Sequence, residues 1–444
     1  MEIARLLAGP AAVSLSFLLA AKQVEPVASH FYLFAWYGLI VTCDQWVRRL
    51  EGRSLISRCG PGFGLLMLWS AAAWFFFEFV NFRLENWYYV LVTDRGWVRA
   101  AGVFLAFATV FPGIFFIAHL LGCTGFPRSI RGPALAMTPL RLELLQVAGA
   151  ACLLLAFWFP RYCFPLVWVF AIAAFAPANY RRGIDGLLRQ LEAGEYAPTL
   201  RMLLAGLLAG GFWQLFNFWS RARWIYTVPF FEELKLFEMP LAGFLGFPPF
   251  AVECACLYRL LVWHRLAPPF GEFSGQQPQA NRPFFLPLAA AVALLFSAAV
   301  FMEVDKRTIT SLTPRVEKVE ALEPEVRSAL REAGVRYLTQ LEGFGSDRRW
   351  QAIAGILGER EVADLKRTAG LYLHQGIGVR WGNLLHRAGI RSLDDLRDLA
   401  AHGVLERLRA AAREDEGLPK PAQVRVWLRR LPPSRQEPGT PLPY

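Results

Sequence analysis

Nine stretches of mostly apolar residues fill the first 302 residues of the chain, and each is close to the length needed to cross a lipid bilayer. About 20 apolar residues in helical form span the hydrocarbon layer. Inside that layer the backbone must satisfy its own hydrogen bonds, so such stretches fold as helices. The predicted spans are residues 4–21, 30–47, 62–82, 98–122, 142–159, 162–178, 199–219, 237–262 and 284–302. The sequence therefore predicts an all-α, polytopic membrane bundle over residues 1–302.

The rest of the chain has a different composition, because charged residues are frequent there and no apolar stretch is long enough to span a membrane. We expect a linker at 303–315, a soluble all-α domain at 316–431 and a disordered, Pro-rich tail at 432–444. The net charge of the whole chain is +11. In the membrane part the positive charge is spread over loops, as the positive-inside rule produces, and does not indicate nucleic acid binding.

A polar and aromatic signature occurs twice in the apolar region. It reads FFFEFVNFRLENWYYV from Phe75 and FWQLFNFWSRARWIYTV from Phe212. The matched pairs include Asn81 with Asn217, Trp87 with Trp224, Tyr89 with Tyr226, Phe107 with Phe244, Pro112 with Pro249 and Leu120 with Leu257. We predict two repeats, about 1–140 and 141–283, followed by an extra span at 284–302. Each repeat has four spans, so the copies share one orientation and their axis lies along the membrane normal.

The distribution of Lys and Arg predicts the orientation of the bundle. The loops at 48–61, 123–141, 179–198 and 263–283 are richer in Lys and Arg than the loops on the opposite side, so they are expected to be cytoplasmic. The signature loops at 83–97 and 220–236 then lie outside the cytoplasm, together with the C-terminal domain. We expect a multi-pass protein of a bacterial inner membrane.

The polar residues of the signature have helical spacing. Glu78, Asn81 and Glu85 fall at positions i, i+3 and i+7, and the same spacing recurs in the second copy. Each copy therefore presents one polar stripe at the end of a span: Glu78, Asn81 and Glu85 in the first copy, and Gln214, Asn217 and Arg221 in the second. If the axis brings the two stripes together, Glu85 and Arg221 could form an ion pair and the amides could bond to each other.

Two interpretations of the stripes remain open. They either join the halves through interhelical hydrogen bonds, or they line a ligand cavity together with the aromatic loops. For the second interpretation the candidate ligand-binding residues are Glu78, Asn81, Glu85, Asn86, Trp87, Tyr89, Gln214, Asn217, Arg221, Trp224 and Tyr226. Metal-ligand and nucleotide-binding motifs are not evident, so we expect no metal site and no cofactor.

The eighth span carries acidic residues that suggest a second kind of site. Glu232 and Glu233 precede it, and Glu253 lies deep inside it, where a carboxyl would be neutral or paired with a group such as His119 or His264. The stretch PFFEELKLF resembles the Pro-x-Glu-Glu-x-x-Leu-Phe segment of membrane carotenoid (lycopene) cyclases, with one extra residue before Glu232. The resemblance implies a membrane enzyme with Glu232, Glu233 and Glu253 as acid/base candidates.

The C-terminal domain also contains a duplication, at an offset of 55 residues. ALEPEVRSALREAGVRYLTQL from Ala321 aligns with GIGVRWGNLLHRAGIRSLDDL from Gly376. Gly334 and Gly389 each follow a helical pattern, which suits a left-handed C-terminal cap. Ser392 with Asp395 suits a helix N-cap of the capping-box type.

The segment Gly376-Ile377-Gly378, with Arg380 after it, lies between two helical patterns and resembles a helix-hairpin-helix module. The whole domain resembles a bacterial domain family of unknown function built from two such units. In such modules the hairpin amides often hold a nucleic-acid phosphate. Because the first copy has lost the hairpin glycines and the domain is only mildly basic, we expect protein packing or self-association, and no nucleic acid partner.

Three hypotheses about function follow. The first is a non-enzymatic bundle that binds a membrane lipid or a small amphipathic molecule, with the soluble domain serving assembly. The second is an enzyme that acts on an isoprenoid or another lipid. The third is a transporter in which Glu78 or Glu253 titrates.

Overall fold

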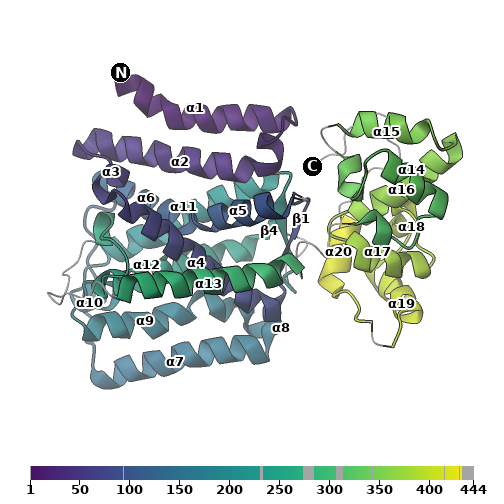
Figure 1. Ribbon diagram of the computed structural model, residues 1–444. Helices are drawn as coiled ribbons and strands as arrows, with labels where there is room; N and C mark the ends of the chain where they lie inside the picture. The colour runs from purple at the N-terminus through teal and green to yellow at the C-terminus, as the bar shows by residue number, and fades with distance from the viewer. Residues whose placement is uncertain are drawn as a thin grey trace.

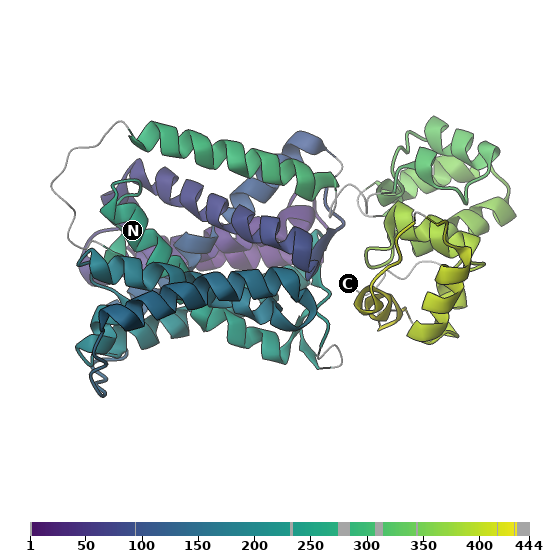
Figure 2. The same ribbon diagram turned by 90° about the horizontal axis from the view of Figure 1, so that it is seen from below.

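The computed structural model describes residues 2–93, 95–230, 234–273, 285–306, 314–342, 345–414, 416–429 and 431–432. Its first part is a bundle of long helices, and its second part is a smaller helical domain beyond one end of that bundle (Figure 1). Figure 2, seen from below, gives the same division. The predicted tail at 432–444 falls, apart from its first residue, outside the described residues, as does much of the predicted linker.

The bundle consists of helices together with two small two-stranded sheets. Its elements are α1 (Glu2–Ala21), α2 (Val27–Glu51), α3 (Leu55–Cys59), α4 (Gly62–Leu84), β1 (Trp87–Val90), α5 (Gly96–Phe107), α6 (Val110–Cys123), α7 (Pro139–Trp158), α8 (Pro160–Cys163), η1 (Phe164–Trp168), α9 (Phe170–Arg181), α10 (Leu187–Glu192), α11 (Ala197–Trp219), β2 (Arg223–Tyr226), β3 (Lys235–Leu236), β4 (Met239–Pro240), η2 (Leu241–Gly246), α12 (Phe247–Trp263), η3 (Gly271–Phe273) and α13 (Phe285–Val304).

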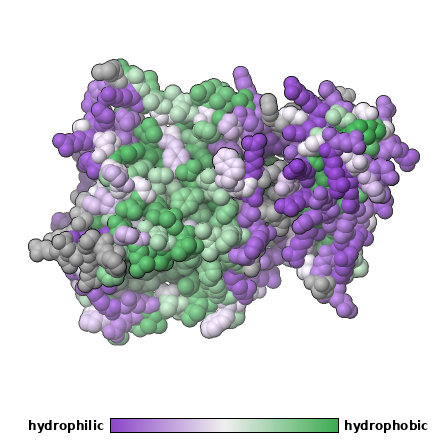
Figure 3. All heavy atoms as spheres, in the orientation of Figure 1, coloured by the Kyte–Doolittle hydropathy of each residue, from purple (hydrophilic) through white to green (hydrophobic). Residues whose placement is uncertain are grey.

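Eight segments among the described residues are helical, long and apolar enough to cross a membrane. They are Glu2–Ala21, Gly62–Leu84, Gly96–Cys123, Pro139–Trp158, Pro160–Arg181, Ala197–Trp219, Leu241–Trp263 and Phe285–Val304. The predicted span at 30–47 lies in α2, which has a kink at His30 and is not one of the eight. Apolar side chains form a band across the bundle, with polar side chains at both of its ends (Figure 3). These properties are compatible with a membrane protein.

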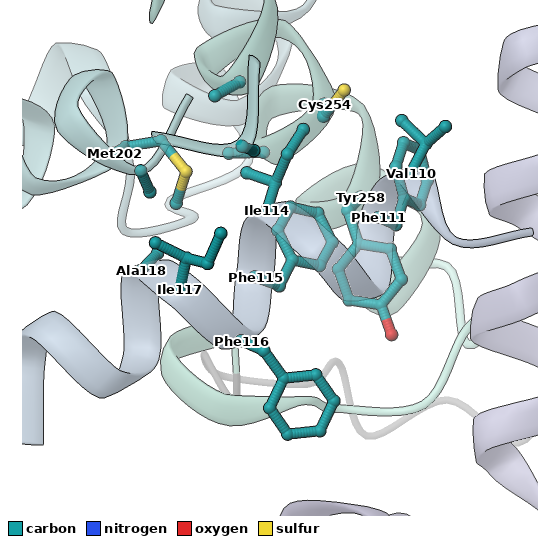
Figure 4. Close-up of a cluster of buried hydrophobic side chains, with 14 of the residues drawn as sticks. Val110, Phe111, Ile114, Phe115, Phe116, Ile117, Ala118, Met202, Cys254 and Tyr258 are labelled. Carbon is teal, nitrogen blue, oxygen red and sulfur yellow. The ribbon is translucent and has the colours of Figure 1, made fainter. Parts of the chain in front are cut away.

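The core of the bundle joins helices from its first and second halves. Side chains of α6, from Val110 to Ala118, pack against Met202 of α11 and against Cys254 and Tyr258 of α12 (Figure 4). Where α5 gives way to α6, the Ser70 hydroxyl donates to the Phe107 carbonyl at 2.7 Å and accepts from the Phe111 amide at 2.9 Å. One side chain thus satisfies backbone groups that the interruption would leave unpaired.

Small residues allow the closest helix contacts in the second half. A Cβ atom added at Gly206 of α11 would lie 2.4 Å from the Phe247 carbonyl oxygen of α12. Contacts of this kind are typical of helices that pack without a hydrophobic driving force. The seven cysteines are all free, and Cys254 and Cys256 are buried in this region. Their position fits the small apolar packing role of unpaired cysteine.

The signature segments differ from the all-α expectation, because they form strands. β1 and β2 pair antiparallel with the register Trp87↔Tyr226, Tyr88↔Ile225, Tyr89↔Trp224 and Val90↔Arg223. A second small sheet, β3 with β4, follows in the next loop. Aromatic and β-branched residues favour the extended backbone, and each strand finds in the other the partner that a single copy would lack.

The C-terminal domain consists of short helices around its own core. They are η6 (Val316–Lys318), α14 (Pro324–Glu332), η7 (Leu338–Leu341), α15 (Ser346–Ala354), α16 (Glu359–Leu373), α17 (Gly378–Arg387), α18 (Leu393–Arg397), α19 (Ala401–Ala411) and α20 (Pro421–Arg429). Tyr372 and Trp427 are its largest fully buried side chains, and the Tyr372 hydroxyl donates to Asn383 Oδ1 at 2.8 Å.

The predicted helix caps of this domain are confirmed. Gly334 and Gly389 have φ of 72° and 79°, the left-handed conformation that glycine adopts without steric cost. The Ser392–Asp395 capping box is also present. Local hydrogen bonds correspond across the 55-residue offset: Gln340 Oε1 accepts from the amides of residues 336 and 337, and Asp395 Oδ2 from those of 391 and 392.

Candidate ligand cavity

A cavity of about 140 Å³ lies where the β1–β2 ribbon meets the helices of the bundle. Its wall is mostly apolar and rich in aromatic side chains, which include Trp74, Trp87, Trp168, Trp213, Trp224, Phe107, Phe247 and Phe250. Polar side chains contribute less of the wall and include Tyr89, Tyr226, Gln214, Arg99 and Arg223. An apolar cleft with a small number of converging polar groups is the usual form of a site for a small molecule.

Glu78 of α4 lies behind this wall and is completely buried. Its Oε1 accepts three hydrogen bonds, from Trp74 Nε1 at 3.2 Å, Trp87 Nε1 at 2.9 Å and the Tyr89 hydroxyl at 2.5 Å. All three donors line the cavity. Burial raises the pKa of Tyr89 well above its usual range, and the nearby Glu78 carboxyl raises it further. The Tyr89 hydroxyl therefore keeps its proton.

Gln214 of α11, the counterpart of Glu78 in the signature, lines the cavity directly. Its Nε2 donates to the Tyr226 hydroxyl at 3.0 Å, whereas its Oε1 has no hydrogen-bond partner among the described residues. The Nε1 donor of the neighbouring Trp213 also lacks a partner there. A buried polar atom without a partner costs about 1–3 kcal/mol. Gln214 and Trp213 both line the cavity, so the wall contains a buried acceptor and a buried donor that have no partner among the described residues.

The signature asparagines do not bond to each other, which is the contact that we expected between the amides. Asn81 Nδ2 donates to the Trp87 carbonyl at 2.9 Å, and Asn217 Nδ2 donates to the Trp224 carbonyl at 2.9 Å. Their Oδ1 atoms accept from the amides of Asn86 and Trp224, at 2.8 and 2.9 Å. Each asparagine thus fixes the strand of its own copy to the end of the preceding helix.

The expected ion pair between Glu85 and Arg221 is absent as well. Glu85 ends α4 in a left-handed conformation, and its carboxylate lies 2.7 Å from Lys420 Nζ of the C-terminal domain. Arg221 lies 3.5 Å from Glu25 Oε1 and donates to the Glu342 carbonyl at 3.0 Å. The outer ends of both stripes therefore contact the C-terminal domain and do not contact each other at the axis.

The predicted ligand residues thus divide into three groups. Trp87, Tyr89, Gln214, Trp224 and Tyr226 line the cavity, Glu78, Asn81, Asn86 and Asn217 are buried around it, and Glu85 and Arg221 lie at the domain contact. Sequence reasoning missed Trp74, Trp168 and Trp213. Trp74 stands four residues before Glu78, and this spacing brings the two side chains to one helix face. The spacing could have predicted that Trp74 lies at the candidate site.

Of the acidic residues proposed for an enzyme, the structure describes only Glu253, which does not line the cavity. Glu232 and Glu233 lie outside the described residues. Glu253 is buried, and its Oε1 accepts from the Ala171 amide at 2.8 Å in the first turn of α9. Its expected partner His119 instead lies 2.9 Å from Glu51. Glu253 therefore serves as an acceptor for a helix N-terminus, a favourable place for a carboxyl group.

The predicted hairpin of the C-terminal domain lies against β1. Gly376 and Gly378 have φ of 81° and 60°, and the Tyr88 hydroxyl donates to the Gln375 carbonyl at 2.7 Å. A Cβ atom at Gly376 would lie 2.2 Å from the Tyr88 ring. Ile377 is fully buried, and the Arg380 guanidinium stacks on Trp381, 4.4 Å from the ring centroid. The hairpin thus contacts another part of the same chain.

Comparison with known families gives one result. Residues 320–430 match the family model described as Domain of unknown function (DUF4332), a stretch that includes α14 to α20. The comparison with curated proteins and that with solved structures gave no match. The C-terminal region thus resembles a domain family whose function is not characterised, as the sequence suggested.

Proposed function

We propose that this chain is a multi-pass membrane protein that binds a lipid or a small amphipathic molecule in the aromatic cavity. The observation that carries the proposal is a pair of buried polar atoms, Gln214 Oε1 and Trp213 Nε1, which have no partner among the described residues and belong to side chains that line a mostly apolar cavity. A hydroxyl group of the ligand would accept from Trp213 and donate to Gln214. If the side-chain amide of Gln214 is rotated by 180°, its free atom is the Nε2 donor. A carbonyl oxygen of the ligand would then accept from both Gln214 and Trp213.

The internal repeat supports this location for the site. Each strand residue of one half has a counterpart 137 positions away in the other half. Replacing both members of the pair Trp87–Tyr226 by their counterparts gives Trp224–Tyr89, which is also a pair of the ribbon. The same replacement converts the pair Tyr88–Ile225 into itself. The ribbon therefore has the register that a two-fold axis through its centre requires. We infer a parallel four-plus-four repeat whose axis runs through the ribbon, with the cavity beside that axis.

The C-terminal domain, in this proposal, is an assembly module of the double helix-hairpin-helix type that seats on the ribbon. Glu85, Tyr88 and Arg221 all contact it. The ribbon and the domain then lie on the same side of the membrane. The positive-inside rule predicts that this is the side of a bacterial inner membrane that faces away from the cytoplasm.

Mass spectrometry of lipids bound to the purified full-length protein tests the proposal. Gly102 lines the cavity, and a Cβ atom there has only ordinary contacts with His30, so Gly102→Leu fills the cavity without displacing backbone. We expect this variant to retain several-fold less ligand than the unaltered protein. The matched control is Gly211→Leu, at a glycine that faces open space outside the cavity lining. Equal retention in all three proteins would count against the site.

A second candidate function is proton transfer to the bound molecule, which would make the protein an enzyme acting on an isoprenoid or another lipid. It is favoured by the 2.5 Å hydrogen bond that the Tyr89 hydroxyl donates to Glu78, because Tyr89 lines the cavity and the carboxyl lies behind it. Such a pair can act as a general acid backed by a second group. Tyr89→Phe and Glu78→Gln should then leave binding within a few-fold while abolishing conversion. Unchanged products with either variant would exclude this candidate.

A further inference from the structure

Three side chains with metal-binding chemistry converge at the end of the bundle away from the β1–β2 ribbon. Glu51 is the last residue of α2, and His119 and Cys123 lie in the last turns of α6. Both helices begin near the ribbon, since α2 starts with residues that line the cavity mouth, and they run to the opposite end (Figure 1). This group is separate from the cavity.

The ligand atoms of the three residues already face one point. His119 Nε2 lies 2.9 Å from Glu51 Oε1, Cys123 Sγ lies 3.2 Å from the same oxygen, and all three atoms fall within 4.8 Å of one another. His119 and Cys123 are four residues apart on one helix, which places both side chains on the same face. Ligands of a tetrahedral ion bound at about 2.0–2.3 Å would be separated by slightly more than the present contacts.

The second carboxylate oxygen of Glu51 is held in place from outside the group. Arg58, which lies just beyond α2, contacts Glu51 Oε2 and leaves Oε1 directed at the histidine and the cysteine. Partners of this kind orient a metal ligand and fix its position. Access from solvent is available, because the Glu51 side chain is 30% exposed and that of His119 is 12% exposed.

We propose that Glu51, His119 and Cys123 bind one divalent ion of the Zn²⁺ type. An imidazole nitrogen, a thiolate and a carboxylate oxygen are the donor set that this borderline ion prefers. Binding displaces the thiol proton of Cys123 to solvent, while the neutral imidazole moves its proton to Nδ1 and binds through Nε2. Three protein ligands leave one tetrahedral position open for water.

Cobalt(II) titration tests the site in the full-length protein purified in detergent and freed of metal with a chelator. A Co²⁺–thiolate bond gives an intense charge-transfer absorption that neither nitrogen nor oxygen ligands produce. We expect one equivalent of Co²⁺ to saturate this band and Zn²⁺ to displace it. Cys123→Ser should abolish the band, and His119→Gln should weaken Co²⁺ binding by at least tenfold.

The matched control is Cys59→Ser, which removes a partly exposed thiol of the neighbouring α3 that is not a member of the group. This variant should bind Co²⁺ as the unaltered protein does. Absence of saturable binding, or a charge-transfer band that survives Cys123→Ser, would overturn the proposal. Thermal unfolding of each metal-free variant separates loss of the site from loss of the fold, because the three side chains lie at a helix end and the metal-free proteins should unfold alike.

Discussion

At the scale of single residues, the buried carboxyl group of Glu253 in α12 has a hydrogen-bond donor in the backbone of α9. Glu253 accepts from the Ala171 amide, which belongs to the unpaired first turn of α9. Glu253→Ala leaves that amide without an acceptor, and we expect a loss of roughly 1–3 kcal/mol in the free energy of unfolding. Glu253→Gln keeps an oxygen acceptor and should lose less than half as much. Thermal or denaturant unfolding in detergent measures both, and equal losses would show that the charge matters more than the acceptor.

The ribbon tyrosines make stability depend on alkaline pH. The pKa of Tyr226 is raised to about 12, mainly by burial. In the unfolded chain a tyrosine titrates near 10. Between about pH 10 and pH 12 the unfolded state therefore binds fewer protons than the folded state, and the free energy of unfolding falls as pH rises. Tyr226→Phe should reduce that slope by about 1.4 kcal/mol per pH unit. Below pH 10 the variant and the unaltered protein should show the same pH dependence.

At the scale of elements, the two asparagines hold the two strands. Asn217 makes two backbone hydrogen bonds to Trp224 of β2, and Asn81 makes one to Trp87 of β1 and one to Asn86, just before β1. Asn217→Leu should therefore speed amide hydrogen exchange over 223–226 by at least tenfold, and Asn81→Leu should do the same over 87–90. Since the strands are paired, each variant should also affect the other strand more weakly. Protection that stays unchanged in both variants would mean that pairing alone holds the ribbon.

The helices were predictable because their signal is local and strong. Apolar length gave the positions of the long helices, and Gly334, Gly389 and Ser392 gave helix ends in the C-terminal domain. The ribbon was not predictable, because each strand is only four residues long and finds its partner some 136 residues away in the other copy of the signature. The candidate cavity was half predictable for the same reason: Tyr89 and Gln214 stand at positions of the repeated signature, whereas Trp168 contributes to the wall from a position with no repeated counterpart.

At the scale of the whole molecule, the seating of the C-terminal domain depends on one close approach. Gly376→Ala brings a Cβ atom into the Tyr88 ring, whereas Gly389→Ala meets nothing within 4 Å. Both changes carry the backbone strain of a positive φ, on the order of 1 kcal/mol, so the second is a control for the first. Only Gly376→Ala should release the domain from the ribbon.

A carbodiimide cross-link between Lys420 and Glu85 reports that seating, because their charged groups lie 2.7 Å apart. The yield should drop several-fold in Gly376→Ala and stay unchanged in Gly389→Ala. Lys420→Gln removes the cross-link and serves as the blank. Equal yields in the two alanine variants would indicate that the domain remains seated without the Gly376–Tyr88 approach.

The shared ribbon also sets an order of events during synthesis. The edge of β1 has no partner until β2 has left the ribosome, on the order of ten seconds later at roughly 5–20 residues per second. Only after the ribbon has formed can the newly made C-terminal domain dock on it, through contacts that include Tyr88. A chain that stops within its second half would expose both the edge of β1 and the open cavity, and quality-control proteases would recognise it as unfinished.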